Sequence, residues 1–348
     1  MTGELVLLTG GTGFLGYAIR VDLLKSGYRV RVAARSQAKI ESVQAALLIS
    51  TLNPPTTQLM FVIVPDMTAI GAYDNAVQGV DFIIHAAAPL HTGSATRKDQ
   101  LEELFVTTSM KGNLSILKSA NEKGKTVRRI VMTSSTVAIA PAEVYCTSDN
   151  KELDVIRGPN SRVAVPGPPY DSELQAYCVG KAAALNYSEA FFRDNTTSFD
   201  LISIMPSLIF GKDELITHTK DMRTASTNML IKGLLTGSQG ISGVGNAVLC
   251  ADVARAHVKA LDPNIEGNQS FLLNTEMEWE DTVPIVKKHF PDAFKSGLFR
   301  EGGRKPTGPL KWDSSKARDV LGINLATYDT MLKEVVGQYL ELVKIEGN

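Results

Sequence analysis

The chain has little of what several classes of protein require. Its 348 residues include three widely spaced cysteines, Cys146, Cys178 and Cys250, which form neither a CxxC pair nor a disulfide framework and suit a reducing compartment. Because 36 basic residues nearly balance 37 acidic ones, no net field favours a nucleic-acid or membrane partner. No uncharged apolar run reaches the roughly 18 residues of a membrane span, and no basic segment of a signal peptide opens the chain. His and Cys lack metal-ligand spacing, so we expect a cytoplasmic protein without a metal.

The most informative segment that is present is LVLLTGGTGFLG, at residues 5–16. It predicts a short buried strand, a turn with glycines at Gly10, Gly13 and Gly16, and the start of a helix. Such a turn lets the backbone approach a pyrophosphate and points a helix N-terminus at the negative charge. The spacing alone is a weak signal, and its weight comes from its position and from the motifs farther along the chain.

Short apolar runs alternate with longer amphipathic segments over the first two thirds of the chain. This alternation predicts βαβ units and therefore an α/β fold with a doubly wound parallel sheet. Beyond Pro206 the rhythm weakens, so we expect a domain at residues 1–207 and a smaller substrate-binding lobe at residues 208–348, some segments of which return to the first domain. The expected strands are 5–8, 28–34, 60–64, 80–86, 127–133, 200–205 and 270–274, and the expected helices are 17–26, 36–50, 69–78, 100–123, 174–193, 219–235 and 251–261.

The second expected strand ends beside a basic residue where many dinucleotide sites have an acidic one. No Asp or Glu lies between Asp22 and Glu41, whereas Arg35 and Lys39 do. An acidic side chain here would bind the ribose 2′-hydroxyl of NAD, but a guanidinium can bind a 2′-phosphate. A solvated cation at a helix entry is the plainer alternative. The pattern favours NADPH over NADH.

Two further segments carry residue types that a dehydrogenase needs. Ser134 and Ser135 follow the fifth expected strand, at the edge where ligands bind in open α/β sheets. Tyr177 and Lys181 lie four residues apart in an expected helix, so phenol and ammonium share a face. The ammonium and an oxidised nicotinamide would lower the tyrosine pKa from roughly 10. Taken singly, a Tyr-Lys pair arises by chance and a Ser-Ser pair is commonly a cap or turn. Their order after the glycine-rich turn predicts a reductase.

With these motifs in place, the chain resembles the extended short-chain dehydrogenases/reductases. It is most similar to the branch that holds dihydroflavonol reductase, cinnamoyl-CoA reductase and the yeast and fungal aldehyde/ketone reductases. The resemblance covers almost the whole chain and is specific for the family, though not for a substrate. The matching segments are TGGTGFLG (9–16), AARSQAK (33–39), PDM (65–67), HAAAP (85–89), TSST (133–136), YCVGK (177–181), IMPSLIFG (204–211), ADVARAHVKAL (251–261) and DSSKARDVLG (313–322).

The resemblance implies a Rossmann domain, a bound NADPH and a catalytic trio. Tyr177 is then the general acid, Lys181 lowers its pKa and binds the nicotinamide ribose, and Ser135, with Ser134 as the fallback, bonds the substrate carbonyl. The other implied cofactor contacts are Gly10, Thr12, Gly13, Phe14 and Leu15 at the pyrophosphate, Arg35 and Lys39 at the 2′-phosphate, Asp66 and Met67 at the adenine, Ala86 and Ala87 on the nicotinamide side, and Pro206 and Leu208 near the nicotinamide amide.

Two positions depart from the family pattern. Many extended members have Asn just before the glycine that is Gly112 here, and this chain has Lys111. That substitution puts in doubt the proton-relay water that the Asn holds. The strand before Pro206 ends in Met205, where the family often has Asn. Both positions vary within the carbonyl-reductase branch.

Histidines and aromatic residues offer further candidates. His85, at a strand end, fits a packed imidazole better than a bond to ribose or substrate, His91 could face the substrate cavity, and His257 fits a packing residue. Trp279 and Trp312 fit packing anchors of the lobe. Segments 138–169 and 211–245 are expected to wall an apolar pocket, although Arg223 and Lys232 could serve an acidic substrate. Their candidate lining residues are Val144, Tyr145, Tyr170, Phe210, Met222, Met229 and Leu230.

The leading hypothesis is an NADPH-dependent carbonyl reductase, a monomer or homodimer that acts on a small-molecule aldehyde or ketone, including secondary-metabolite intermediates. One alternative is an NAD-retaining nucleotide-sugar epimerase or dehydratase, which would need a basic cleft for a diphosphate. Another is a non-catalytic dinucleotide-sensing regulator. Such regulators commonly lose the Tyr or the Lys, and this chain keeps both.

Overall fold

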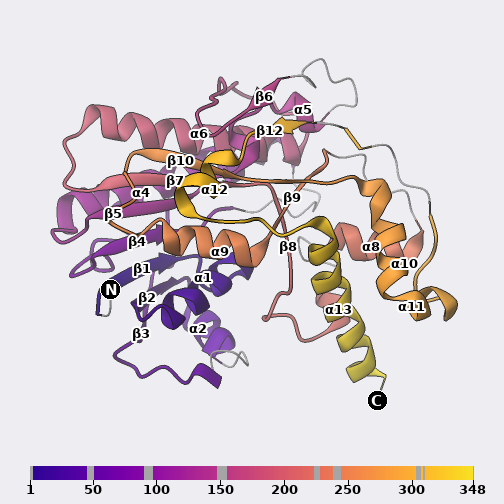
Figure 1. Ribbon diagram of the computed structural model, residues 1–348. Helices are drawn as coiled ribbons and strands as arrows, with labels where there is room; N and C mark the ends of the chain where they lie inside the picture. Colours follow the sequence, from indigo (N-terminus) through magenta and orange to yellow (C-terminus); the bar gives the residue numbers. More distant parts are fainter. Residues whose placement is uncertain are drawn as a thin grey trace.

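A seven-stranded parallel sheet forms the centre of the computed structural model, with helices on both faces and a smaller lobe to one side (Figure 1). The strands lie in the order β10-β7-β5-β4-β1-β2-β3, so the chain winds outward in both directions from β1 and confirms the doubly wound α/β prediction. The structure describes residues 3–44, 51–89, 97–146, 155–222, 228–237, 244–302, 307–308 and 310–347.

The strands of this sheet are short apolar runs, and all except the edge strand β3 are largely buried on both faces. They are β1 (Leu5–Thr9), β2 (Arg29–Ala34), β3 (Leu59–Ile63), β4 (Phe82–His85), β5 (Arg129–Thr133), β7 (Asp200–Pro206) and β10 (Gln269–Leu273). One face is covered by α1 (Phe14–Lys25), α9 (Cys250–Lys259) and α12 (Ser315–Leu321), and the opposite face by α4 (Thr108–Lys123) and α6 (Glu173–Asp194). The helix α2 (Gln37–Gln44) follows β2.

Two expected helices take other forms. Residues 69–78 form consecutive turns, because Gly71 and Gly79 adopt φ of +70° and +67° at either end. The expected helix 100–123 is interrupted before α4 by η1 (Lys98–Gln100) and by the π-helix η2 (Glu102–Thr107). A π-turn widens the helix locally, and such turns are frequent at functional sites.

The lobe has its own core, which lies beside the sheet. It contains the small sheet β11-β9-β8, whose strands are β8 (Leu208–Phe210), β9 (Asn246–Leu249) and β11 (Thr275–Glu276). Trp279 packs there edge-on against Phe210, with ring centroids 6.1 Å apart. Trp312 instead joins a cluster with Met205 and Leu272 of the main sheet. The helices of the lobe are α7 (Thr219–Met222), α8 (Asn228–Thr236), α10 (Thr282–His289), α11 (Pro291–Lys295) and α13 (Tyr328–Glu346).

Short elements complete the chain between these two parts. After β5 come η3 (Thr136–Ala138), α5 (Glu143–Cys146) and β6 (Ile156–Arg157), and β6 pairs with β12 (Lys311–Trp312). A further 3-10 turn, η4 (Trp279–Asp281), precedes α10.

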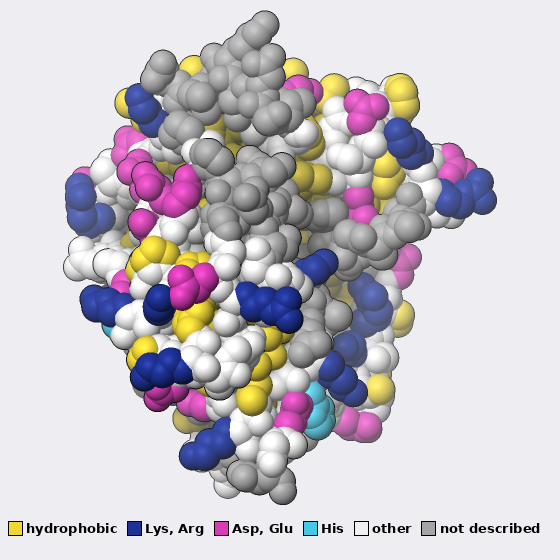
Figure 2. Space-filling view, turned by 90° about the vertical axis from the view of Figure 1, so that its right-hand side faces the viewer, with side chains coloured by type: hydrophobic (Ala, Val, Ile, Leu, Met, Phe, Trp, Pro, Cys, Tyr) yellow, Lys and Arg dark blue, Asp and Glu magenta, His cyan; other side chains and the backbone are white. Residues whose placement is uncertain are grey.

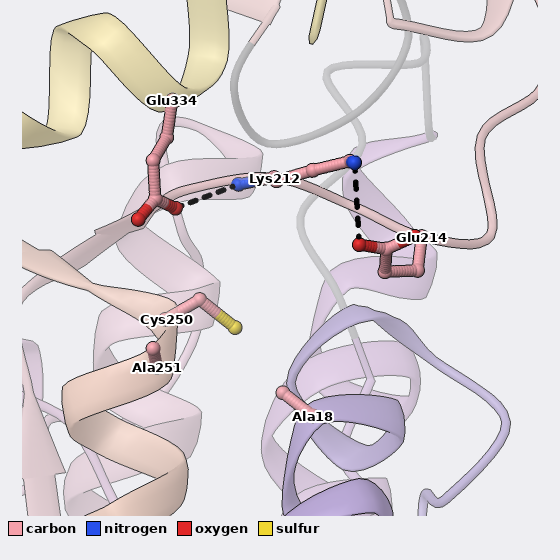
Figure 3. Close-up of a pocket in the computed structure, with 6 residues that line it drawn as sticks. All are labelled: Ala18, Lys212, Glu214, Cys250, Ala251 and Glu334. Carbon is pink, nitrogen blue, oxygen red and sulfur yellow. Dashed lines mark hydrogen bonds and ion pairs between the residues drawn. The ribbon is translucent and has the colours of Figure 1, made fainter. Parts of the chain in front are cut away.

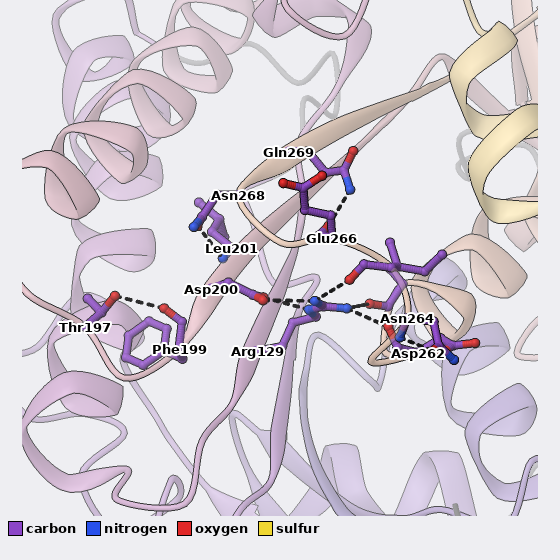
Figure 4. A network of polar contacts seen from close by, with 12 residues as sticks. Arg129, Thr197, Phe199, Asp200, Leu201, Asp262, Asn264, Glu266, Asn268 and Gln269 are labelled. Atoms are coloured by element: carbon purple, nitrogen blue, oxygen red, sulfur yellow. Dashed lines mark hydrogen bonds and ion pairs between the residues drawn. The ribbon is translucent and has the colours of Figure 1, made fainter.

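A buried arginine clamps the amino-terminal edge of the sheet (Figure 4). Arg129 holds the Asp200 carboxylate with two hydrogen bonds, of 2.6 and 2.9 Å. Its remaining donors reach the backbone carbonyls of Ala260, Asp262 and Ile265 at 2.7–2.9 Å. All five guanidinium N–H groups therefore have acceptors, which ties β5, β7 and the loop after α9 together.

Candidate active site

The carboxyl ends of the parallel strands lie at one edge of the sheet, and several of the expected site residues follow these strands. The register pairs Thr9 of β1 with His85 of β4, and His85 with Met132 of β5. Residues that follow these strands therefore share that edge. They include Gly10 after β1, Arg35 after β2, Asp66 after β3, Ala86 and Ala87 after β4, Ser135 after β5, and Pro206 and Leu208 at the end of β7.

The glycine-rich turn is shaped by close backbone contacts. Gly10 adopts a φ of +72°, and a Cβ there would lie 2.7 Å from the backbone of Ala86 and Ala87. A Cβ on Gly16 would overlap the carbonyl oxygen of Gly10. At Gly13, the residue before α1, a Cβ would make an ordinary contact at 3.6 Å. The turn thus lies against the start of α1, and a helix N-terminus at this place is the kind of site that binds a pyrophosphate. Thr12, Phe14 and Leu15 are half-buried beside it.

The expected 2′-phosphate site is exposed and basic. Arg35 and Lys39 are both solvent-exposed, and Arg35 forms none of the ion pairs found among the described residues. Asp66 accepts hydrogen bonds from the amide and hydroxyl of Thr68, which lower its carboxyl pKa, as does the nearby Arg35 to a smaller extent. Met67 packs against Gly112 of α4, where a Cβ would overlap its methyl group.

The helix α6 presents Tyr177 and Lys181. The helix begins after Ser172, whose hydroxyl accepts the amide of Gln175 at 3.1 Å. The Tyr177 ring stands edge-on to Phe105 of η2, with centroids 6.4 Å apart. A Cβ on Gly180 would lie 2.5 Å from the Phe105 carbonyl oxygen, so the π-helix fixes the depth of this part of α6.

Burial controls the charges of this pair. It raises the pKa of Tyr177 well above its usual value, with a smaller contribution from Cys178. It lowers the pKa of Lys181 from 10.5 to about 8. Lys181 is not among the causes of the tyrosine shift in the ligand-free protein, so the expectation that Lys181 and an oxidised nicotinamide lower the tyrosine pKa stays a prediction for the cofactor-bound site. A neutral phenol at neutral pH is the form that can donate a proton.

The two serines after β5 face different surroundings. The Ser135 hydroxyl donates to the Pro206 carbonyl at 3.4 Å and accepts the Val137 amide at 3.3 Å, so it lies beside the end of β7. The Ser134 hydroxyl is buried without a hydrogen-bond partner among the described residues, beside a chamber of about 10 Å³ that Asn113 also lines. This difference favours Ser135 as the serine that meets a ligand.

Two buried histidines lie behind these groups. The Nδ1 of His85 bonds the Thr9 hydroxyl at 2.9 Å, and burial followed by the charge of Lys181 lowers its pKa to about 3. His85 is 2% exposed, which agrees with a packed imidazole. His257 bonds the Thr133 hydroxyl through Nε2 at 2.8 Å. His91 lies outside the described residues.

Asn113 is a polar residue of this region that the sequence did not single out. Its amide donates to the Ser188 hydroxyl at 3.1 Å and to the Ala184 carbonyl at 3.4 Å, and so joins α4 to α6. Lys111, the departure from the family pattern, points outward and lies 3.7 Å from Glu103. The other departure, Met205, is fully buried. Residues 111 and 113 point to different faces of a helix. This helical period is the one feature of the sequence that could have indicated that Asn113, unlike Lys111, faces the interior.

A larger cavity than the chamber beside Ser134 lies elsewhere among the described residues. It measures about 400 Å³ and lies between α1, the start of α9 and α13 (Figure 3). Lys212, Glu214 and Glu334 supply its charges, and none of the expected site residues lines it. Phe210, Met222 and Leu230, expected on a pocket wall, are instead buried in the core of the lobe, while Tyr170 donates to Glu102 at 2.5 Å. The Arg223 and Met229 side chains are outside the described part of the chain.

The surface, the helices and the potential metal ligands add three observations. Basic and acidic side chains are interspersed on the described part of the face in Figure 2, with no broad area of one sign. Among the described helices, none has both the length and the apolar composition needed to cross a bilayer. No three His, Cys, Asp or Glu side chains converge as metal ligands within the described ranges.

The sheet and the glycine-rich turn define a Rossmann-type dinucleotide-binding fold. Residues 6–273 match the model of the NAD dependent epimerase/dehydratase family, and the chain belongs to this family, an extended branch of the short-chain dehydrogenases/reductases, as the sequence predicted.

Similar proteins span nearly the whole chain. It is 35% identical over 353 residues to a protein named ketoreductase CTB6 of Cercospora nicotianae, with 98% of this chain and 96% of that protein covered. It is 34% identical to NAD-dependent epimerase/dehydratase ALT6 of Alternaria alternata, with 92% and 94% covered. The crystal structure of Gre2 in complex with NADPH from Candida albicans has the same fold, with a TM-score of 0.83 at 23% identity and coverage of 97% and 99%.

Proposed function

We propose that the protein is an NADPH-dependent carbonyl reductase in which Tyr177 donates the proton. The observation that carries the proposal is the placement of Tyr177 and Lys181 on α6 with Ser135 after β5. The ketoreductase relative, similar over nearly the full length of both chains, supports the same reaction class.

The residues present fit NADPH. Gly10 and Gly16 leave the turn without side chains at the place where a pyrophosphate would lie, and Arg35 offers an exposed guanidinium for the 2′-phosphate. Lys181 is buried, and burial lowers its pKa to about 8, so a ribose hydroxyl that accepts a hydrogen bond from the ammonium would favour the charged form. When bound, the reduced nicotinamide supplies the hydride.

The side chains then divide the remaining work. Ser135 donates a hydrogen bond to the substrate carbonyl oxygen and polarises it. Tyr177 gives its proton to the same oxygen as negative charge develops there, and its raised pKa keeps that proton in place at neutral pH. Lys181 orients the cofactor ribose and stabilises the phenolate that Tyr177 leaves behind.

The proposed substrates are moderately apolar aldehydes and ketones, including intermediates of secondary metabolism. Tyr145, whose ring packs among apolar residues near Tyr177, supports this class. We place the protein in the cytoplasm, as a monomer or homodimer. A nucleotide-sugar epimerase is the second candidate, favoured by the name of the Alternaria relative.

A substrate screen tests the proposal. Oxidation of NADPH would be followed across aldehydes, diketones, β-keto esters and aromatic ketones. Tyr177→Phe should lower kcat at least about 100-fold, because general acid catalysis commonly contributes that much. Tyr187→Phe is the matched control, since its side chain lies on the same helix and is 49% exposed. Tightly retained NAD, together with epimerisation of a sugar nucleotide and no carbonyl turnover, would replace the proposal with the second candidate.

A further inference from the structure

His257 is a fully buried residue of α9 that forms hydrogen bonds through both ring nitrogens. Its Nδ1 lies 2.8 Å from the Val253 carbonyl oxygen, and its Nε2 lies 2.8 Å from the Thr133 hydroxyl. A carbonyl oxygen only accepts, so Nδ1 must carry the hydrogen. Burial lowers the pKa of the ring to about 4, which leaves it neutral. Nε2 therefore accepts, and the Thr133 hydroxyl donates.

Thr133 is the last residue of β5 and leads directly into the two serines. On one side, β7 holds this turn, because the Ser134 amide donates to the Ile204 carbonyl at 2.7 Å and the Ser135 hydroxyl reaches Pro206. On the side of α9, the hydrogen bond from Thr133 to His257 holds the same turn. The end of β5 is thus tied to two separate elements.

The helix that carries His257 also packs in the cluster that contains α1. Val253 and Ala256 of α9 share this cluster with Ile19 and Leu23 of α1. Because α1 begins at the glycine-rich turn, the His257–Thr133 bond connects the serine turn to the layer behind the expected pyrophosphate site.

We infer that His257 is a positioning residue, which by accepting the Thr133 hydroxyl holds Ser135 in register with Tyr177 and the cofactor. The inference rests on the proposed function of Ser135. Small displacements of a reacting group are costly in rate, with roughly 100-fold lost for a shift of about 1 Å. A residue that only filled space and bonded Val253 would have no such effect on turnover.

Two substitutions at His257 test its two hydrogen bonds separately. In His257→Asn the amide nitrogen can replace Nδ1 and donate to Val253, but the side chain is too short to reach Thr133. In His257→Gln the longer side chain can bring its oxygen to the place of Nε2. Positioning through Thr133 is expected to lower kcat about 10- to 100-fold in His257→Asn and less than about 3-fold in His257→Gln, with KM for NADPH unchanged in both.

Thr133 offers the reciprocal pair. Thr133→Val removes the hydroxyl at nearly constant volume and should reproduce the loss in His257→Asn, whereas Thr133→Ser should keep most of kcat. The double variant His257→Asn/Thr133→Val should lose little more than either single variant, because both remove the same bond.

The outcomes are distinguishable. The ring-nitrogen chemical shifts of His257 should show the hydrogen on Nδ1, and a hydrogen on Nε2 would overturn the inference. Wild-type kcat in His257→Asn and Thr133→Val, with reduced thermal stability, would also overturn it and leave a packing role. If the wild-type protein turns over no carbonyl compound at all, the proposed function fails, and the positioning role fails with it even where the shifts show the expected hydrogen bond.

Discussion

Replacing Lys181 with methionine should stabilise the ligand-free protein while it removes activity. Lys181 is 8% exposed, and burial lowers the pKa of its ammonium from 10.5 to about 8. Each pH unit between the folded and unfolded pKa values corresponds to about 1.4 kcal/mol. The charged lysine therefore costs the fold ~3 kcal/mol at pH 7. Methionine fills a similar volume without a charge, so most of this cost should disappear.

The gain in the free energy of unfolding of Lys181→Met should decrease as the pH rises. The folded pKa lies below the unfolded one, so the unfolded chain holds the extra proton between pH 8 and pH 10.5. Wild-type stability rises with pH through this window, and the advantage of Lys181→Met shrinks through it. Below about pH 8 the advantage is complete, and above about pH 10.5 it should vanish, because both side chains are then neutral.

Urea unfolding of the ligand-free proteins at several pH values would measure this difference. Lys111→Met is the control, because that side chain is 51% exposed and should change the free energy of unfolding by less than about 1 kcal/mol. Steady-state assays of the same preparations should show Lys181→Met to be nearly inactive. A destabilised Lys181→Met protein at pH 7 would refute the reasoning, since it would mean that the ammonium has a stabilising partner in the fold.

Three other changes test the cofactor site and the scaffold. Arg35→Ala should raise KM for NADPH about 10-fold or more while leaving KM for NADH nearly unchanged, whereas Arg29→Ala, at the other end of the same strand, should alter neither. Gly16→Ala should abolish NADPH binding measured by fluorescence titration, because its Cβ would overlap a backbone carbonyl of the glycine-rich turn. Arg129→Met should lower the free energy of unfolding by about 3–5 kcal/mol, because it leaves a carboxylate and three carbonyls without donors. Arg128→Met, half-exposed at the neighbouring position, should cost less than about 1 kcal/mol, and equal losses in both would contradict the clamp.

The sheet could be predicted from the sequence because most of its strands are buried on both faces and form continuous apolar runs. The helical period at residues 69–78 was misleading. Tyr73 and Val77 are buried as that period requires, but the flanking Gly71 and Gly79 adopt positive φ and the segment closes as turns. Likewise, nothing local marks the π-helix η2. The π-helix contacts Gly180 of α6, a residue that is distant in the sequence.

The same division applies to the site. Tyr177 and Lys181 are four residues apart, so a local pattern suffices to place them together on α6. Their pKa values depend on how deeply α6 is buried, which no spacing encodes. The Thr133–His257 bond joins residues 124 positions apart, and it exists only because α9 packs beside the end of β5. Sequence reasoning could name His257 as buried but had no means of finding its partner.

Burial shifts the pKa values of Tyr177 and Lys181 in opposite directions, and these shifts favour carbonyl reduction over alcohol oxidation. It raises the pKa of the phenol and lowers that of the ammonium, so both groups favour their neutral forms. A protonated phenol suits reduction, whereas alcohol oxidation requires the phenolate. The positive charge of an oxidised nicotinamide would lower the pKa of Tyr177 and so favour the phenolate. Desolvation in the site raises that pKa and opposes this effect. The rate of alcohol oxidation should therefore peak at a higher pH than the rate of carbonyl reduction. Coincident pH optima for the two directions, measured with one substrate pair, would show that burial does not govern the proton on Tyr177.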